Sequence, residues 1–87
     1  MSVPLVTVAT LQKQFGLILR RRRQAAKLSQ EKLAELAGLH RTFVSFLERG
    51  LRKPTIDTLK SLAVALKTSM VSLIEELEER DSRVAGS

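Results

Sequence analysis

Three polar side chains lie close together near the middle of the sequence: Arg41, Thr42 and Ser45. In a helix, Val44 and Leu47 would anchor this segment on its inner side and leave the three polar groups on the opposite face. The guanidinium of Arg41 can donate two hydrogen bonds to O6 and N7 of guanine, a pairing worth about 1–3 kcal/mol of discrimination between bases. The hydroxyl and methyl groups of Thr42 suit an adenine edge or a thymine methyl, and Ser45 follows one turn later. This chemistry is suited to reading DNA base edges.

Two short helices joined by a tight turn are predicted for residues 29–50. Ser29 and His40 occupy the positions of the two N-caps, whose side chains can accept a bond from the free amides of the first turn. Gly38 can adopt the positive φ needed where the first helix stops, and Gly50 closes the second. The predicted apolar face of the first helix has helical spacing and consists of Leu33, Leu36 and Ala37.

The ordered pattern over about residues 15–77 resembles the lambda-repressor-like helix-turn-helix family, also called Cro/CI or XRE-type. Each match is weak by itself, but the ordered set is specific. The residues that carry it are Leu28, Ser29, Gln30, Leu33, Ala34, Gly38, Val44, Leu47, Glu48, Gly50, Lys53, Pro54, Thr55, Leu59, Leu62, Ala63, Ala65 and Leu66. The resemblance implies an all-α, five-helix DNA-binding domain whose second motif helix enters the major groove.

The resemblance also implies roles for the polar and aromatic residues around that helix. The expected base-reading residues are Arg41, Thr42, Ser45 and Phe46. The expected phosphate-binding residues are Gln30, His40, Phe43, Arg49, Arg52 and Lys53. Gln30 stands at a helix N-terminus, where free amides and the helix dipole favour an anion. Phosphate contacts position a protein without reading sequence. Alternatives stay open here: Phe43 and Phe46 could pack instead, and Arg52 and Lys53 could be ordinary solvated loop cations.

Four consecutive arginines, Arg20 to Arg23, fall inside a helix predicted from about Ala9 or Thr10 to Ala26. Successive helical residues point about 100° apart, so the four cannot face one partner. The resemblance implies that Arg23 turns inward to form a structural, bidentate ion pair with Glu48. The other three are expected in solvent, with the stem of Arg22 extending the buried side and one or two reaching phosphates. That buried side is predicted to consist of Leu11, Phe15, Ile18, Leu19 and Ala26.

Two more helices are predicted, one from Ile56 to Leu66 capped by Thr55, and one capped by Ser69 that runs to about Glu79. The inner stripe of the fourth helix is Ile56, Leu59, Leu62, Ala63 and Leu66. The fifth has an acidic side made of Glu75, Glu76, Glu78 and Glu79. Its apolar side either closes the core or forms a dimer interface, or does both with Leu73 inside and Leu77 across the axis. The predicted interface residues are Met70, Leu73, Ile74 and Leu77.

The chain divides into a DNA-binding domain over residues 9–79 with short segments on both sides. Residues 1–8 form an apolar N-terminal arm that is either disordered or packed on a neighbour, and residues 80–87 form a flexible tail expected to fray. Eighty-seven residues suit one domain, and the 44% hydrophobic and 3% aromatic content predicts a core of Leu, Val, Ile and Ala.

Charge is distributed unevenly along the chain. Residues 1–54 hold eleven Lys or Arg against three Glu, hence +8, whereas residues 55–87 hold four against six acidic residues, hence −2; together these give the net +6. Such a basic half is either a solvated surface or a surface that attracts polyanions, and beside the helix-turn-helix pattern the second is favoured. RNA is disfavoured, because the deep, narrow groove of A-form RNA does not admit this helix.

Several other classes of protein are not expected. There is no Cys and a single His, so we expect no metal site, and no pattern calls for a cofactor. No paired carboxylates, Cys/His couple or glycine-rich phosphate loop suggests an enzyme. Apolar runs are far shorter than the ~18 residues of a membrane span, and no signal peptide is evident. A cytoplasmic protein at the bacterial nucleoid is expected.

Within the family, residues 39–50 are similar to the controller proteins of restriction–modification systems, although His40 stands where those often carry Asp. This similarity implies a homodimeric transcriptional regulator that binds a symmetric double-stranded operator and switches its own operon between activation and repression. RNA polymerase would be a further partner during activation. The alternatives are a phage-type repressor, or an antitoxin whose acidic last helix binds a toxin.

Overall fold

Five helices account for the secondary structure of residues 8–86, the part of the chain that the computed structural model describes; side chains are described for residues 10–81. They are α1 (Val8–Ala25), α2 (Gln30–Ala37), α3 (Arg41–Glu48), α4 (Ile56–Ala65) and α5 (Met70–Gly86). The predicted all-α, five-helix class is therefore confirmed. The arm predicted for residues 1–8 lies outside the described residues except for Val8, which begins α1. Within residues 8–86, no helix has both the length and the apolar character needed to cross a bilayer.

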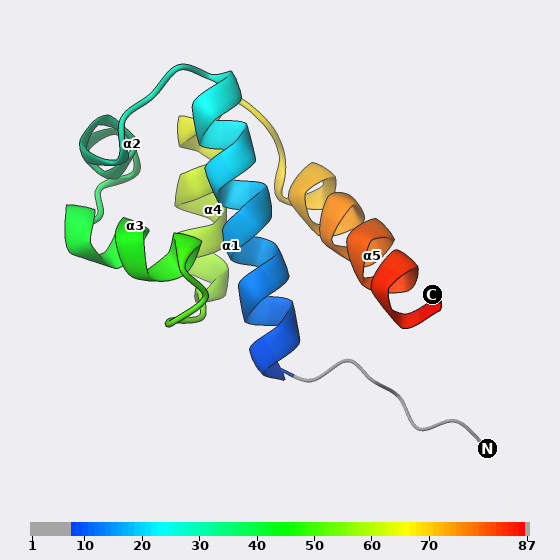
Figure 1. Cartoon of the computed structure of the whole chain (residues 1–87). Coiled ribbons are helices and arrows are strands. Elements are labelled where there is room, and N and C mark those ends of the chain that lie inside the picture. Colours follow the sequence, from blue (N-terminus) through cyan, green and yellow to red (C-terminus); the bar gives the residue numbers. More distant parts are fainter. Residues whose placement is uncertain (1–7, 87) are drawn as a thin grey trace.

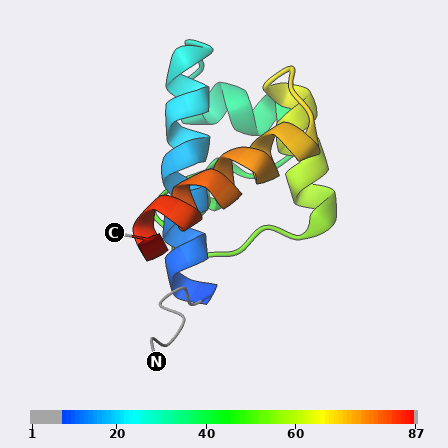
Figure 2. The same ribbon diagram turned by 90° about the vertical axis from the view of Figure 1, so that its right-hand side faces the viewer.

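The long helix α1 is the scaffold on which the others are placed. In Figure 1 it runs through the middle of the molecule, with α2 and α3 on its left and α5 on its right. Figure 2 shows α5 running obliquely across α1, and α4 near the beginning of α5 at the right of the view. α1 packs against both α3 and α5, α2 packs against α3 and α4, and α4 packs against α5. α3 and α5 are therefore placed relative to each other through α1 directly, and through α2 and α4 less directly.

The core is a single cluster to which all five helices contribute. Its fully buried side chains are Ile18, Leu19, Leu33, Val44, Leu47, Leu62 and Leu73. Burying an aliphatic side chain of this size contributes about 1.5–3 kcal/mol. Gly16 lets α1 approach α3 closely, because a Cβ there would come within 2.5 Å of the backbone carbonyl oxygens of Leu47 and Glu48. The backbones of α1 and α3 are therefore in close contact at Gly16.

The predicted N-caps are confirmed at the start of α2, α3, α4 and α5. In each case the capping side chain accepts a hydrogen bond from a backbone amide of the first turn, which has no acceptor within the helix itself. The four bonds run to Ser29 Oγ from Lys32 N (2.9 Å), to His40 Nδ1 from Thr42 N (3.1 Å), to Thr55 Oγ1 from Thr58 N (3.1 Å) and to Ser69 Oγ from Ser72 N (3.0 Å).

The helix ends were only partly predicted. Gly38 and Gly50 adopt φ of 69° and 73°, as expected. Lys27 and Lys67 also adopt positive φ, 60° and 57°, which glycine alone usually does without strain. Their amides and those of the following residues bond back to carbonyls of the preceding helix, which closes it. α1 accordingly ends at Ala25, and Ala26, predicted on its buried side, is exposed.

Two residues predicted on inner faces lie outside. Ile56 is 76% exposed, because it is the first residue of α4 and lies a full turn before the core begins at Leu59. Leu36 is 49% exposed, because α2 reaches the core through Leu33 and Ala34 and leaves Leu36 at the edge.

The fifth helix differs from prediction in length. It continues to Gly86 instead of ending near Glu79, so residues 80–86 of the predicted tail are helical. No Gly or Pro interrupts the segment before Gly86, and Gln14 Nε2 of α1 donates to Asp81 Oδ1 at 3.4 Å, beyond the predicted end.

Side chains of the first two turns of α5 also turn toward the rest of the chain. Leu73, one of the predicted dimer-interface residues, is 1% exposed and lies in the core, in agreement with the alternative that placed Leu73 inside. Glu76, predicted on the outer acidic side, faces α1 and pairs with both Arg21 and Arg22. These two arginines are therefore not the freely solvated cations that the sequence suggested.

Candidate nucleic-acid interface

The outward face of α3 is polar and the inward face is sealed. Val44, Leu47 and Glu48 are buried, and they fix which side of the helix is presented. Arg41 and Thr42 are exposed at its first turn. His40 starts the helix through its cap, so the exposed side chains project from a defined helix end.

The predicted base-reading residues come together in one place. A surface depression of about 230 Å³ is lined by Gln30, Arg41, Thr42, Ser45, Phe46 and Arg49. All four residues predicted to read bases are in this set, together with two of those predicted to bind phosphate. Gln30 comes from the start of α2 and the others from α3 and its end. Both helices of the motif thus contribute to a single surface.

Beneath this surface, Arg23 and Glu48 form the bidentate pair that the resemblance implied. Arg23 Nε donates to Glu48 Oε2 at 2.6 Å and Nη2 donates to Oε1 at 3.0 Å, while Nη1 donates to the carbonyl of Leu28 at 2.8 Å. Hydrogen bonding to Glu48 raises the pKa of Arg23 above its usual value, because the bonds stabilise the charged guanidinium. The pair joins α1 to the end of α3.

Gln30 contacts this buried pair and also lines the depression described above. Its Nε2 donates to Glu48 Oε1 at 3.0 Å. That bond orients the amide, because it decides which end faces Glu48, and it links the start of α2 to the end of α3. Sequence reasoning placed Gln30 at a phosphate but did not foresee this link, for which spacing gives no signal.

Phe46 supports two cations. The guanidinium carbon of Arg52 lies 5.5 Å from the centroid of its ring, and that of Arg49 lies 6.0 Å from it. Attraction between a cation and an aromatic face contributes about 0.5–1 kcal/mol at exposed sites. Phe46 therefore restrains two arginines that the sequence presented as separate loop or helix-end residues. The available signal was their spacing, three and six residues after the ring.

Phe43, His40 and Lys53, which were also predicted to bind phosphate, do not line this depression. Phe43 is half-buried and packs against the core, so of the two roles left open for it the structure favours packing. His40 is occupied as a cap through Nδ1. Lys53 is exposed but lies in another groove, between α1, α4 and α5. The carboxylate of α3, Glu48, is buried under Arg23, so the exposed face of α3 and its end carries positive charge.

Comparison with known proteins agrees with this arrangement. A family model described as Helix-turn-helix matches residues 19–73, which include the whole of α2, α3 and α4. The chain belongs to the helix-turn-helix family. The family resemblance proposed from the sequence is therefore confirmed.

Relatives of this helix-turn-helix chain include control proteins of restriction–modification systems. It is 50% identical over 52 residues to the control protein C.SmaI of Serratia marcescens, over 60% of this chain and 62% of that protein. The chain thus spans less than two thirds of the length of that relative. The crystal structure of the restriction-modification controller protein C.AhdI from Aeromonas hydrophila matches with a TM-score of 0.70 at 42% identity, covering 71% of this chain and 94% of that one.

A further solved structure holds DNA. The restriction-modification controller protein C.Esp1396I, as a tetramer in complex with its natural 35 base-pair operator, matches this helix-turn-helix chain with a TM-score of 0.75 at 30% identity. The match covers 82% of this chain and 93% of that one.

Proposed function

We propose that this chain is a sequence-specific, double-stranded DNA-binding transcriptional regulator that acts as a homodimer on a symmetric operator, as the controller protein of a restriction–modification operon. The observation that carries the proposal is the joint surface of Gln30, Arg41, Thr42, Ser45, Phe46 and Arg49 at the exposed end of α3. The relatives that share the fold and include control proteins of such systems support the specific role.

In this proposal, α3 enters the major groove with its first turn against the bases. Arg41 bonds to guanine and Thr42 meets an adenine edge or a thymine methyl, since both are exposed at that turn. Ser45, half-buried one turn later, reaches a base or a phosphate, and the ring of Phe46 lies against the same groove wall.

Phosphate contacts flank the reading helix on both sides. Gln30 stands at the N-terminus of α2, where free amides favour an anion. Arg49 and Arg52, restrained over Phe46, bind the DNA backbone beyond the end of α3, and Lys53 binds it separately, from the following loop. His40 lies beside the phosphate near the start of α3, and Phe43 is assigned to packing. These contacts supply affinity that falls as salt rises.

The proposed dimer interface is on α5. Met70, Ile74 and Leu77 remain from the predicted set, and Val71, 65% exposed, joins them. Two apolar hollows adjoin there: one of about 240 Å³ that includes Ile56, Ile74 and Leu77, and one that includes Met70, Val71 and Ile74. A dimer would set two recognition helices about 34 Å apart, one turn of DNA. RNA polymerase is the proposed partner during activation. The regulator acts at the nucleoid in the cytoplasm and has no catalytic role.

Selection of bound fragments from random DNA tests the proposal. A twofold-symmetric consensus is expected. Arg41→Ala is then expected to cost about 1–3 kcal/mol at that site and to relax preference at one base pair, because a bidentate base contact is lost. Lys60→Ala, which removes an exposed cation of α4 outside the surface, is the control. If Arg41→Ala weakens binding to consensus and random DNA equally, Arg41 contacts only a phosphate. If the selected fragments share no consensus sequence, the proposed function is refuted.

The interface is tested separately by Val71→Asp, which places a charge on the apolar face of α5. Val64→Asp is the matched control, since Val64 is 60% exposed on α4. Sedimentation is expected to show a dimer for the control and a monomer for Val71→Asp, because a charge cannot be desolvated there without a partner. Identical masses for the two variants would show that this face of α5 does not form the interface.

A further inference from the structure

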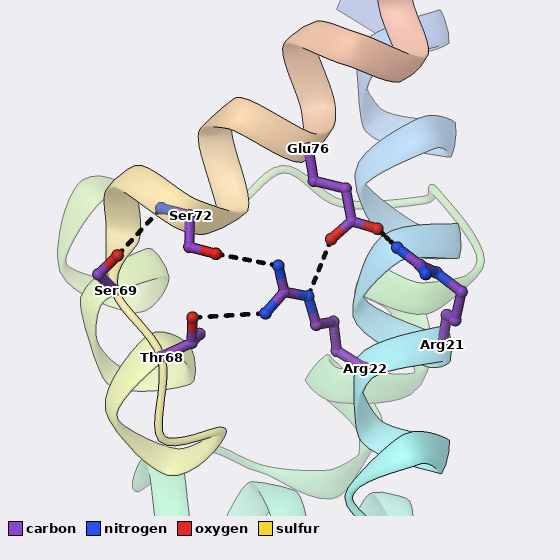
Figure 3. A network of polar contacts seen from close by, with 6 residues as sticks. All are labelled: Arg21, Arg22, Thr68, Ser69, Ser72 and Glu76. Atoms are coloured by element: carbon purple, nitrogen blue, oxygen red, sulfur yellow. Dashed lines mark hydrogen bonds and ion pairs between the residues drawn. The ribbon is translucent and has the colours of Figure 1, made fainter.

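Arg22 holds the beginning of α5 at three points (Figure 3). Its Nε donates to Glu76 Oε1 at 2.8 Å, its Nη2 to Ser72 Oγ at 3.1 Å and its Nη1 to Thr68 Oγ1 at 3.3 Å. Arg21 pairs with the other oxygen of Glu76. One guanidinium, only 29% exposed in its side chain, thus contacts the α4–α5 turn and the first two turns of α5.

These three acceptors define a direction as well as a position. Ser72 and Glu76 are four residues apart and therefore lie one above the other on the same face of α5. Thr68 lies in the turn before the helix, just after Lys67, which is held at a φ of 57°. Contacts at the turn and at two successive levels of the helix fix both where α5 starts and where it points.

The neighbouring residue does the same for α3. Arg23 is bound to Glu48 at the end of α3, and adjacent helical residues point about 100° apart. Two successive residues of α1 therefore hold two different helices, α5 through Arg22 and α3 through Arg23. Gly16 brings α1 and α3 into close backbone contact, so that side of the arrangement has little freedom.

We propose that Arg22 is a positioning residue that sets the angle between the dimer-forming helix and the DNA-reading helix, and so the half-site separation that the dimer accepts. This rests on the proposed function, since it requires a dimer formed through α5. The burial of Leu73 and the bond from Gln14 to Asp81 do not involve Arg22, so we expect α5 to pivot about these contacts when Arg22 is removed, and not to detach. A twofold axis applies any such rotation to both copies, which doubles the misplacement between the two recognition helices.

The test compares binding to the selected symmetric operator with binding to operators whose half-sites are one base pair closer or farther apart, and to a single half-site. Arg22→Ala is expected to reduce the preference for the natural separation by about tenfold, which corresponds to about 1.4 kcal/mol, with unchanged affinity for the half-site. Arg20→Ala, which removes an exposed cation of α1 outside this network, is expected to keep the preference.

Two further variants separate positioning from charge and from folding. Arg22→Lys keeps the charge but cannot reach three acceptors at once, so an intermediate preference is expected. Glu76→Gln keeps the shape of the acceptor and supplies the same comparison if Arg22→Ala loses its helical circular dichroism. The inference alone would be overturned if the wild-type protein discriminates between half-site separations and both Arg22→Ala and Glu76→Gln keep its preference for the natural one. A wild-type protein indifferent to separation would overturn it together with the proposed dimer.

Discussion

The two sides of α1 carry the same kind of ion pair in different surroundings. On the α3 side, the side chains of Arg23 and Glu48 are 12% and 3% exposed. On the α5 side, those of Arg22 and Glu76 are 29% and 14% exposed. The first pair is almost sealed from water, whereas the second is partly hydrated and is shared with Arg21. Adjacent residues of one helix thus form a closed contact and an open one.

This difference separates what is fixed from what can be adjusted. A desolvated charge has no substitute for its partner, so removing one member of a buried pair is costly even where the intact pair adds little net stability. A partly exposed charge is hydrated again when its partner is removed, so that removal costs less stability and mainly allows the two helices to move relative to each other. We therefore interpret the α3 side as the rigid support of the helix proposed to read DNA, and the α5 side as the side that sets the geometry of the proposed dimer.

The largest effect is expected for Glu48→Ala. It strands the guanidinium of Arg23 in a buried position and also removes the acceptor of Gln30, so the free energy of unfolding should fall by about 3–5 kcal/mol. Urea denaturation followed by circular dichroism measures it. If Glu48→Ala costs no more than Glu76→Ala, the sealed pair is not the more rigid side and the comparison fails.

A smaller loss, about 1–2 kcal/mol, is expected for Glu76→Ala, because Arg22 and Arg21 keep partial access to water when their acceptor is removed. Arg22 also retains Ser72 and Thr68 as acceptors. The same denaturation experiment applies, with Glu75→Ala, an exposed neighbour on α5, as the control. A loss as large as that of Glu48→Ala would show that the second side is as closed as the first.

Much of this arrangement could be predicted because it depends on local chemistry or on an ordered pattern. Ser29, Thr55 and Ser69 cap their helices through bonds within one turn, which sequence spacing defines. The pair of Arg23 and Glu48 was implied by the resemblance, and it is present. The caps need no knowledge of how two distant helices cross, and for the pair between α1 and α3 that knowledge came from the family resemblance.

What was missed depends on crossing angles or on strain that leaves no sequence signal. Glu76 is one of four glutamates on α5, and only the oblique packing of α5 across α1 decides that it turns inward. Ile56 follows the apolar spacing of α4 but falls before the helix meets its neighbours. Lys27 and Lys67 adopt positive φ although lysine has no preference for it. The DNA contacts of Arg41 and Thr42 stay a prediction.

The smallest effect is expected at the exposed pair of Lys32 and Glu35, whose side chains are 53% and 68% exposed. The hydrogen bond from Lys32 lowers the pKa of Glu35, so any stabilisation is present above the carboxylate's ordinary pKa and disappears as pH falls through the lowered value. Because both groups are hydrated, Glu35→Ala should leave the melting temperature at neutral pH almost unchanged and remove only a slight acid dependence. A neutral-pH loss equal to that of Glu76→Ala would mean that pairing itself, and not exclusion of water, controls the cost, and the distinction between the two sides of α1 would lose its physical basis.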